Sequence, residues 1–254
     1  MEYAVCTVAA AAVRKEPSHK TEMTNQLLFG ETMKVLETKD EWFLVRSMYD
    51  NYEGWLTHHL IDEIGKDIAW EPLQFVCSDL VNFIQFSNQL LNAPMGAALT
   101  GFEKETGALW DKQYSFDGQY RSFEQPSNEN ELLETARKWL NAPYLWGGKT
   151  LMGVDCSGFV QTVFKVHGIR LGRDAWQQAK DGEGVEQLSL AKTGDVAFFN
   201  NSEGKIIHVG ILLNRNQIIH ASGKVRIDKI DEEGIINLQT GKRTHQLHSM
   251  KRFF

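Results

Sequence analysis

A change of pattern near residue 126 is the feature that most constrains the fold. Before it, short runs of β-forming residues alternate with turn dipeptides such as Gly30-Glu31 and Lys39-Asp40, as in small antiparallel β domains. After it, two segments with apolar residues at helical spacing are followed by several β-rich runs. Because the helices precede the strands instead of alternating with them, this second half is predicted to be α+β.

Three domains are predicted from these signals. Residues 1–64 are expected to form a small β-barrel, residues 67–125 a second and more divergent one, and residues 127–254 the α+β domain. The strands expected in the two small domains are residues 4–13, 32–37, 42–47, 90–99 and 108–114, with a tight turn at Asp117-Gly118.

The two small domains are interpreted as a divergent repeat. In the first, Gly30-Glu31-Thr32 is followed by Trp42. In the second, Gly96-Ala97-Ala98 is followed by Trp110. Self-similarity of this kind predicts two units of the same architecture.

Two helices and three strands are predicted in residues 127–254. Ser127 or Asn128 is expected to cap the first helix, which Pro143 ends. Asp155 is placed as the N-cap of the second helix, and Gly168 as its C-terminal stop. The three β-rich runs are residues 195–199, 208–213 and 217–221.

Asp155-Cys156-Ser157-Gly158 is the most informative segment for chemistry. With Asp155 as N-cap, Cys156 occupies the first turn of a helix, where the positive end of the helix dipole favours the thiolate. The N–H groups of that turn can hold a developing oxyanion, and Gly158 leaves room for a substrate backbone. A lone Cys at a helix start is more often structural, so a catalytic role requires a basic partner.

Two histidines on a predicted hairpin supply that partner. Asn214-Arg215-Asn216 is expected to form a three-residue turn, so that residue 213 pairs with 217 and residue 210 with 220. His208 and His220 then share one face as diagonal neighbours, and His208 can reach the thiol while His220 holds its other nitrogen. The remaining histidines, interpreted as surface or packing residues, are His19, His58, His59, His167, His245 and His248.

Composition argues against several other classes of function. The net charge is −6 and no run of Lys and Arg is longer than a pair, which does not suit a nucleic-acid partner. No apolar stretch is long enough to span a membrane. No CxxC or HExxH motif supports a zinc site, and no metal or organic cofactor is expected. Cys6 and Cys77 are expected to be buried small hydrophobes, not parts of a disulfide framework.

Several motifs, taken together and in order, resemble a known family. They are Pro143-Tyr144-Leu145-Trp146-Gly147-Gly148, Asp155-Cys156-Ser157-Gly158-Phe159-Val160, Gly194-Asp195-Val196, His208-Val209-Gly210-Ile211 and His220-Ala221. Over residues 127–254 the chain resembles the NlpC-type cell-wall cysteine peptidases. The N-terminal half resembles bacterial SH3-like domains through Arg14-Lys15-Glu16-Pro17-Ser18 and Tyr52-Glu53-Gly54-Trp55.

This resemblance implies both a fold and an activity. The fold would be a papain-like catalytic domain preceded by one or two SH3-like barrels, with Cys156 as nucleophile, His208 as general base and His220 as the orienting third member. The activity would be that of a γ-D-glutamyl-L-diamino acid endopeptidase, which cuts murein stem peptides with a free N-terminal L-alanine. Two alternatives stay open: an amidase or acyltransferase acting on another substrate, and a wall-binding module that has lost activity.

The resemblance also implies residues that bind the substrate. Glu16 and Tyr52 would contact its ammonium group, although Glu16 could be a surface turn residue and Tyr52 could be barrel packing. The other matching positions are Tyr144, Trp146, Asp155, Ser157 and Asp174. Family members often carry Ser after the last of these, and this chain has Ala175 instead, so one substrate hydrogen bond is missing from the pattern.

Partner and location follow from the same resemblance and from the cysteines. The expected partner is a murein stem peptide, and a monomer is the expected state. Three unpaired cysteines and the lack of a visible signal peptide favour the cytoplasm, where recycled wall fragments would be processed. A periplasmic or secreted protein is the alternative if a signal peptide has been removed.

Overall fold

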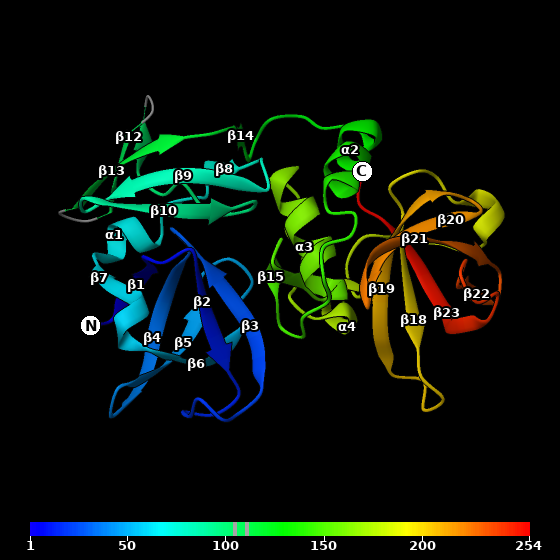
Figure 1. The fold of residues 1–254 in the computed structure, drawn as a ribbon, viewed down its shortest axis with the longest axis horizontal. Helices are drawn as coiled ribbons and strands as arrows, with labels where there is room; N and C mark the ends of the chain where they lie inside the picture. The colour runs from blue at the N-terminus through cyan, green and yellow to red at the C-terminus, as the bar shows by residue number, and fades with distance from the viewer. Residues whose placement is uncertain (104–105, 110–111) are drawn as a thin grey trace. The chain divides into compact units, whose positions relative to one another are not determined.

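The computed structural model describes residues 1–103, 106–109 and 112–254 (Figure 1). Internal contacts divide the chain into two compact units. The first contains Met1–Gln125 and Trp146–Leu151, and the second contains Pro126–Leu145 and Met152–Phe254. Among the described residues no helix is both long and apolar enough to cross a membrane.

The first unit begins with an antiparallel sheet in the order β3-β2-β6-β5-β4-β1-β7. Its elements are β1 (Tyr3–Cys6), β2 (Ala10–Arg14), β3 (Met23–Leu28), β4 (Thr32–Lys39), β5 (Trp42–Ser47), β6 (Glu53–Thr57), the 3₁₀ helix η1 (His58–Leu60) and β7 (Ile61–Ile64). Val13, Leu27, Met33 and Leu56 from four of these strands are buried in one core. Alternate apolar residues of these strands thus face one core, while Tyr3, Val5 and Leu28 are buried in a second one.

The predicted strand at residues 4–13 is wrong, because the run forms two strands, β1 and β2. Residues 7–9 turn between them, and the Thr7 N–H donates to the Leu60 carbonyl at 3.1 Å. The run contains neither Gly nor Pro, so its sequence carries no turn signal. The strands predicted at residues 32–37 and 42–47 are confirmed as β4 and β5.

The first unit continues with a second antiparallel sheet, in the order β10-β9-β13-β12-β11, and a separate two-stranded pair, β14-β8. The elements are α1 (Lys66–Ala69), β8 (Phe75–Cys77), β9 (Val81–Phe86), β10 (Gln89–Pro94), β11 (Phe102–Glu103), β12 (Thr106–Leu109), β13 (Lys112–Asp117) and β14 (Tyr120–Ser122). Phe29, which follows β3, packs edge-on against Phe86 and Tyr114, so the two sheets share one apolar core.

Two predicted strands of this second region have different bounds. The strand expected at residues 90–99 ends at Pro94, after which Gly96 turns the chain with φ of 82°. The run at residues 108–114 covers the end of β12 and the start of β13, and residues 110 and 111 lie outside the described ranges. Trp110 of the proposed repeat is one of these two residues.

Strand β9 was not predicted, although its residues alternate between exposed and buried. The polar Asn82 occupies one of the buried positions and obscures the alternation in the sequence. Its amide nitrogen donates to the carbonyls of Asp79 at 2.8 Å and Ala93 at 3.2 Å, which compensates the burial of that nitrogen.

The segment Trp146–Leu151 belongs to the first unit through contacts with the barrel. The Lys149 N–H donates to Gln26 Oε1 at 2.7 Å, and Lys149 Nζ lies 3.4 Å from Glu31 Oε1. Both charged side chains are almost completely buried, so each offsets the other's loss of hydration. Trp146 is exposed, but its Nε1–H donates to Glu22 Oε1 at 2.7 Å.

The second unit combines helices with a closed barrel of six strands, β18 to β23 (Figure 1). The helices are α2 (Glu129–Lys138), α3 (Cys156–Val166), α4 (Ala175–Gln178) and the 3₁₀ helix η2 (Leu188–Leu190). The barrel strands are β18 (Val196–Asn200), β19 (Ile206–Asn214), β20 (Gln217–Ser222), β21 (Lys224–Asp231), β22 (Gly234–Ile236) and β23 (Arg243–Arg252). Three short strands complete the list: β15 (Lys149–Thr150) in the first unit, and β16 (Gly153–Val154) and β17 (Glu183–Val185) in the second.

The helix predictions hold at their starts, and the first is wrong at its end. Asn128 caps α2, since its side-chain oxygen accepts from the N–H groups of Asn130 and Glu131. The helix stops at Lys138, well before Pro143, because turns follow and Asn141 adopts a left-handed φ of 72°. Helix α3 is confirmed at both ends.

The strand pairing that places the two histidines is confirmed, and only the turn differs. Gly210 pairs with His220, as predicted. Near the turn, Asn214 pairs with Gln217 after a bulge, so the connection is shorter than the expected three residues. A Cβ at residue 210 would lie 2.8 Å from His220 Cβ, which shows why glycine stands opposite this ring.

Candidate active site

Cys156 is the first residue of α3, at the place the sequence predicted. Asp155 precedes it with extended backbone angles, and its Oδ1 accepts the Gly158 N–H at 2.6 Å. Every residue of α3 is buried, and the helix contacts β19 and β20. The local sequence and the surrounding barrel therefore fix the direction of the first helical turn and the position of its thiol.

Asp155 is held in turn by an arginine that the sequence analysis missed. Arg173 Nη2 lies 2.7 Å from Asp155 Oδ2, and Nη1 lies 3.0 Å from Oδ1. Nη1 also donates to Ser157 Oγ at 2.9 Å. Two of the predicted substrate positions, Asp155 and Ser157, thus share one buried guanidinium. The only sequence signal was that Arg173 sits beside Asp174, which the family pattern had singled out.

His208 and His220 meet within the barrel as the hairpin geometry predicted. His208 Nε2 lies 2.8 Å from His220 Nδ1, and the two rings are nearly perpendicular, at 84°. Both side chains are buried. The residue after His208, Val209, places its backbone N–H against the Cys156 thiol. The structure therefore joins His208 to His220 by a hydrogen bond and places the strand that carries His208 beside the Cys156 thiol.

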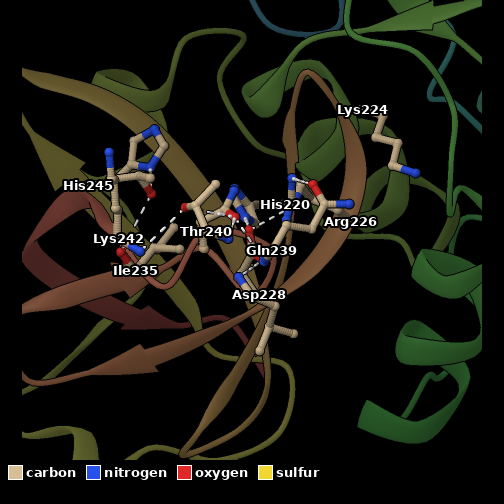
Figure 2. Close-up of polar contacts among 12 residues, drawn as sticks. His220, Lys224, Arg226, Asp228, Ile235, Gln239, Thr240, Lys242 and His245 are labelled. Atoms are coloured by element: carbon tan, nitrogen blue, oxygen red, sulfur yellow. Dashed lines mark hydrogen bonds and ion pairs between the residues drawn. The ribbon is translucent and has the colours of Figure 1, made fainter.

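A further pair of charged residues joins this site and was not predicted. His220 Nε2 lies 3.1 Å from Asp228 Oδ2, and Arg226 Nη2 donates to Asp228 Oδ1 at 2.9 Å (Figure 2). Arg226 stands directly opposite His220 in the β20–β21 pairing, so Asp228 is its diagonal neighbour. Extending the period of two through the Gly223 turn would have found both residues.

The thiol of Cys156 is more basic than the helix position alone suggested. Burial and the Asp155 carboxylate raise its pKa to about 12, against the opposing effects of the Val209 N–H and the Arg173 guanidinium. The helix start does lower this pKa as predicted, through the Ser157 N–H, but burial outweighs it, and the resting thiol keeps its proton. A neutral thiol needs a base close by to lose its proton.

His208 is suited to be that base because it is uncharged. Burial, with the neighbouring His220 and His245 rings, lowers its pKa well below the usual value. His245 stacks on His208 with ring centroids 4.1 Å apart, and burial lowers its own pKa to about 4. His245 thus packs as interpreted, and the ring that it packs against is that of the predicted base, His208. Within the described ranges no group of His, Cys, Asp and Glu is arranged to hold a metal ion.

Two other predicted positions of the second unit lie near these groups or on the neighbouring helix. Tyr144 is partly buried, and burial together with the Cys156 and Asp155 groups raises the pKa of its phenol. It therefore keeps its proton and can donate a hydrogen bond. Asp174 precedes α4; its N–H donates to Gln177 Oε1 at 2.8 Å, and its Oδ2 accepts from Trp176 Nε1 at 3.1 Å.

Three predicted substrate positions belong to the first unit. Glu16 is exposed and lies in the turn between β2 and β3, where its carbonyl accepts from Thr21 Oγ1 at 3.0 Å. Tyr52 is partly buried just before β6, and its N–H donates to Asp50 Oδ1 at 3.1 Å. Trp146 is the third, held by Glu22 as described above.

Sequence comparison assigns part of each unit to a known domain. A sequence model of the NlpC/P60 family matches residues 141–244, which include Cys156, His208 and His220. A second model, described as the bacterial dipeptidyl-peptidase SH3 domain, matches residues 13–60. The two matches occur in the order that the sequence analysis expected.

Related proteins match over most of the chain. The γ-D-glutamyl-L-lysine dipeptidyl-peptidase of Bacillus subtilis is 30% identical over 213 residues, which are 77% of this chain and 71% of the relative. Dipeptidyl-peptidase 6 of Lysinibacillus sphaericus is 24% identical over 263 residues, or 91% and 92% of the two chains. A crystal structure of an NlpC/P60 family protein from Bacillus cereus has a TM-score of 0.81 at 20% identity, covering 98% of this chain and 99% of that one. The predicted fold class, a papain-like domain after an SH3-like region, is confirmed.

Proposed function

The chain belongs to the NlpC/P60 family of cell-wall cysteine peptidases, and we propose that it cuts between γ-D-glutamate and the diamino acid of murein peptides with a free N-terminal L-alanine. One observation carries this proposal. His208 is hydrogen-bonded to His220, and the residue after His208, Val209, places its N–H against the Cys156 thiol. The name of the B. subtilis relative supports the substrate, since a dipeptidyl-peptidase releases two residues from a free amino end.

Acylation in this proposal begins with proton transfer from the Cys156 thiol to His208 Nδ1. The sulfur attacks the γ-carbonyl carbon, and the carbonyl electron pair moves to oxygen. The N–H of Cys156 and the hydroxyl of Tyr144 would stabilise that oxyanion. The imidazolium of His208 then protonates the amino group of the diamino acid as the C–N bond breaks, which leaves a thioester.

Deacylation reverses these roles. A water molecule gives its proton to His208 and attacks the thioester carbonyl. The C–S bond breaks, and the sulfur takes the proton back from the imidazolium. L-Ala-γ-D-Glu is released, and the thiol and the imidazole return to their neutral forms, which are the forms favoured by the raised pKa of Cys156 and the lowered pKa of His208.

The direct test is hydrolysis of L-Ala-γ-D-Glu-L-Lys and its meso-diaminopimelate analogue, followed by mass spectrometry. We expect release of the dipeptide by the wild-type protein and a loss of at least about a thousandfold with Cys156→Ala, since the nucleophile acts as a unit with its base. Cys77→Ala, which also removes a buried thiol, is the matched control and should keep its activity. Equal release by the wild type and Cys156→Ala would reject the proposal.

The assignments of Glu16 and Tyr52 as ligands of the substrate ammonium group stay predictions. They are supported by the match of residues 13–60 to a dipeptidyl-peptidase SH3 domain. If they are correct, Glu16→Gln should raise KM for the free tripeptide about tenfold, the value of one charged hydrogen bond. N-acetylation of the substrate should abolish that difference. Trp146, Asp155, Ser157 and Asp174 stay predicted substrate contacts in the same sense.

Location also stays a proposal, and it rests on the cysteines. Three cysteines without a disulfide, one of which must remain reduced, suit a reducing compartment and therefore the cytoplasm. Cell fractionation with an antibody against the protein tests this. Recovery in the periplasm or the culture medium would contradict it.

A further inference from the structure

Asp228 ends a chain of hydrogen bonds that begins at His208. His208 Nε2 lies 2.8 Å from His220 Nδ1. His220 Nε2 in turn lies 3.1 Å from Asp228 Oδ2, and Figure 2 shows these two side chains. The side chains of His220 and Asp228 are each only 1% exposed. Water therefore does not compete for these hydrogen bonds, and each of the two ring nitrogens of His220 bonds to one protein group.

The carboxylate of Asp228 is kept ionised where it stands. Arg226 Nη2 donates to Oδ1 at 2.9 Å, Arg226 Nε lies 2.8 Å from Oδ2, and the Leu238 N–H donates to Oδ1 at 2.8 Å. Burial raises the pKa of Asp228, but the bonds from His220, Leu238 and Arg226 outweigh it and hold that pKa below its usual range. An ionised carboxylate can only accept hydrogen bonds.

This fixed charge determines where the protons of both rings lie. Because Asp228 can only accept, the neutral His220 ring carries its proton on Nε2, and its Nδ1 is left as an acceptor. His208 must then carry its proton on Nε2 to donate to that acceptor. The lone pair of His208 therefore stands on Nδ1, the nitrogen that the proposed mechanism uses as the base.

We propose that Asp228 is a positioning residue that sets the tautomer of His208 through His220, with Arg226 and Leu238 holding it in place. The inference rests on the proposed function, because a base on His208 Nδ1 matters only if Cys156 is the nucleophile. The set Cys156–His208–His220 then gains a fourth member that touches neither substrate nor thiol.

Asp228→Asn separates this role from that of a simple ion pair. Oδ1 accepts two hydrogen bonds from donors that cannot become acceptors, the Leu238 N–H and the Arg226 guanidinium. Arg226 Nε lies 2.8 Å from Oδ2 but makes no hydrogen bond to it. The amide oxygen should therefore take that place, and the NH₂ should face His220. His220 must then accept on Nε2 and donate from Nδ1, which forces the His208 proton onto Nδ1. His208 Nδ1 then has no lone pair to act as the base, although Asn has nearly the same shape as Asp.

The expected result is a fall in kcat of at least tenfold, with KM for the tripeptide changed less than threefold. The rate of Cys156 alkylation by iodoacetamide at pH 7.5 should fall at least fivefold, and this readout needs no peptide substrate. Wild-type kcat in Asp228→Asn would overturn the inference. If the wild-type protein fails to cut the tripeptide but the alkylation rates differ as expected, the proposed substrate fails and the role of Asp228 stands.

The same substitution in a His220→Asn variant distinguishes a positioning role of Asp228 from a merely structural one. Asp228 acts through the His220 ring, so adding Asp228→Asn to His220→Asn should change the alkylation rate less than twofold. A full additional loss in that background would overturn the inference. If Asp228→Asn does not fold, Asp228→Glu and Asp228→Gln make the same comparison with equal side-chain length. Glu should exceed Gln in alkylation rate at least fivefold, and equal rates would reject the role.

Discussion

Two arginine–carboxylate pairs of the second unit consist of the same chemical groups but position different partners. In Arg173–Asp155 the closest atoms are 2.7 Å apart, and in Arg226–Asp228 they are 2.8 Å apart. Besides its arginine, Asp155 accepts a hydrogen bond from a backbone group, the Gly158 N–H in the first turn of α3. Asp228 also accepts a backbone N–H, that of Leu238, but its other oxygen contacts a side chain, the His220 ring.

The difference between the pairs lies in what can respond when a charge is removed. A backbone N–H has one form and must be satisfied, so the Arg173–Asp155 pair is part of the fold. An imidazole has two tautomers and can adapt, so the Arg226–Asp228 pair selects a chemical form. Arg173 is also more deeply buried, with a side chain 1% exposed against 14% for Arg226. We therefore expect loss of Arg173 to affect mainly stability, and loss of Arg226 mainly activity.

Arg173→Gln is the most severe test of the comparison. It leaves the buried Asp155 carboxylate without its guanidinium, and breaking a buried pair in this way costs about 3–5 kcal/mol. The free energy of unfolding in urea should fall by that amount, and turnover should fall with it because the first turn of α3 loosens. Arg243→Gln is the control, since its pair with Asp231 is exposed and contributes little to stability. A loss as small as the control's would break the comparison.

Arg226→Gln should have a smaller effect on stability and a distinct effect on catalysis. Asp228 keeps the Leu238 N–H and His220, so the loss is that of one charged hydrogen bond, about 1.5–3 kcal/mol. The carboxylate becomes free to rotate, and kcat should fall about two- to tenfold with little change in KM. Arg226→Lys, which keeps a charge, should lose less. A larger loss of stability than in Arg173→Gln would reverse the comparison.

The sequence predicted those parts of the site that depend on local geometry. Asp155 as a cap and Cys156 in the first turn follow from residues within one helical turn of each other. Gly210 opposite His220 follows from a hairpin whose two strands are neighbours in sequence, and the pairing survived even though the turn was shorter than expected. Resemblance to a family supplied the roles, but these placements came from the pattern alone.

The parts that the sequence did not predict depend on burial or on a third strand. Burial raises the pKa of Cys156, and no local pattern shows how deeply a helix start will be buried. Asp228 lies on β21, one strand beyond the analysed hairpin, and Arg173 reaches Asp155 from the segment before α4. In the first unit the polar Asn82 hid strand β9 for a similar reason, since the hydrogen bond from its amide nitrogen to the Ala93 carbonyl forms only when β9 and β10 pair.

A substitution of His245 should give the smallest effect on stability, because the titration of this ring does not change stability at neutral pH. The pKa of His245 is lowered by burial to about 4 from the usual 6.5, so the folded chain resists a proton that the unfolded chain accepts. Stability from this group is therefore complete above pH 6.5 and is lost as the pH falls toward 4. His245 stacks on His208, whose pKa is also lowered, and both rings lie in the site that contains Arg226 and Asp228.

His245→Phe should keep the stacking on His208 and remove the titration. At pH 7.5 the free energy of unfolding should match the wild type within about 0.5 kcal/mol, as for other conservative substitutions. Between pH 6.5 and 4 the variant should lose stability less steeply, by at most about 1.4 kcal/mol per pH unit, the value of one proton. Because His245 is only partly buried, the measured difference should be smaller than this limit. Some acid sensitivity must remain, since His208 still resists protonation; a variant with none would assign the whole effect to His245 and contradict the lowered pKa of His208.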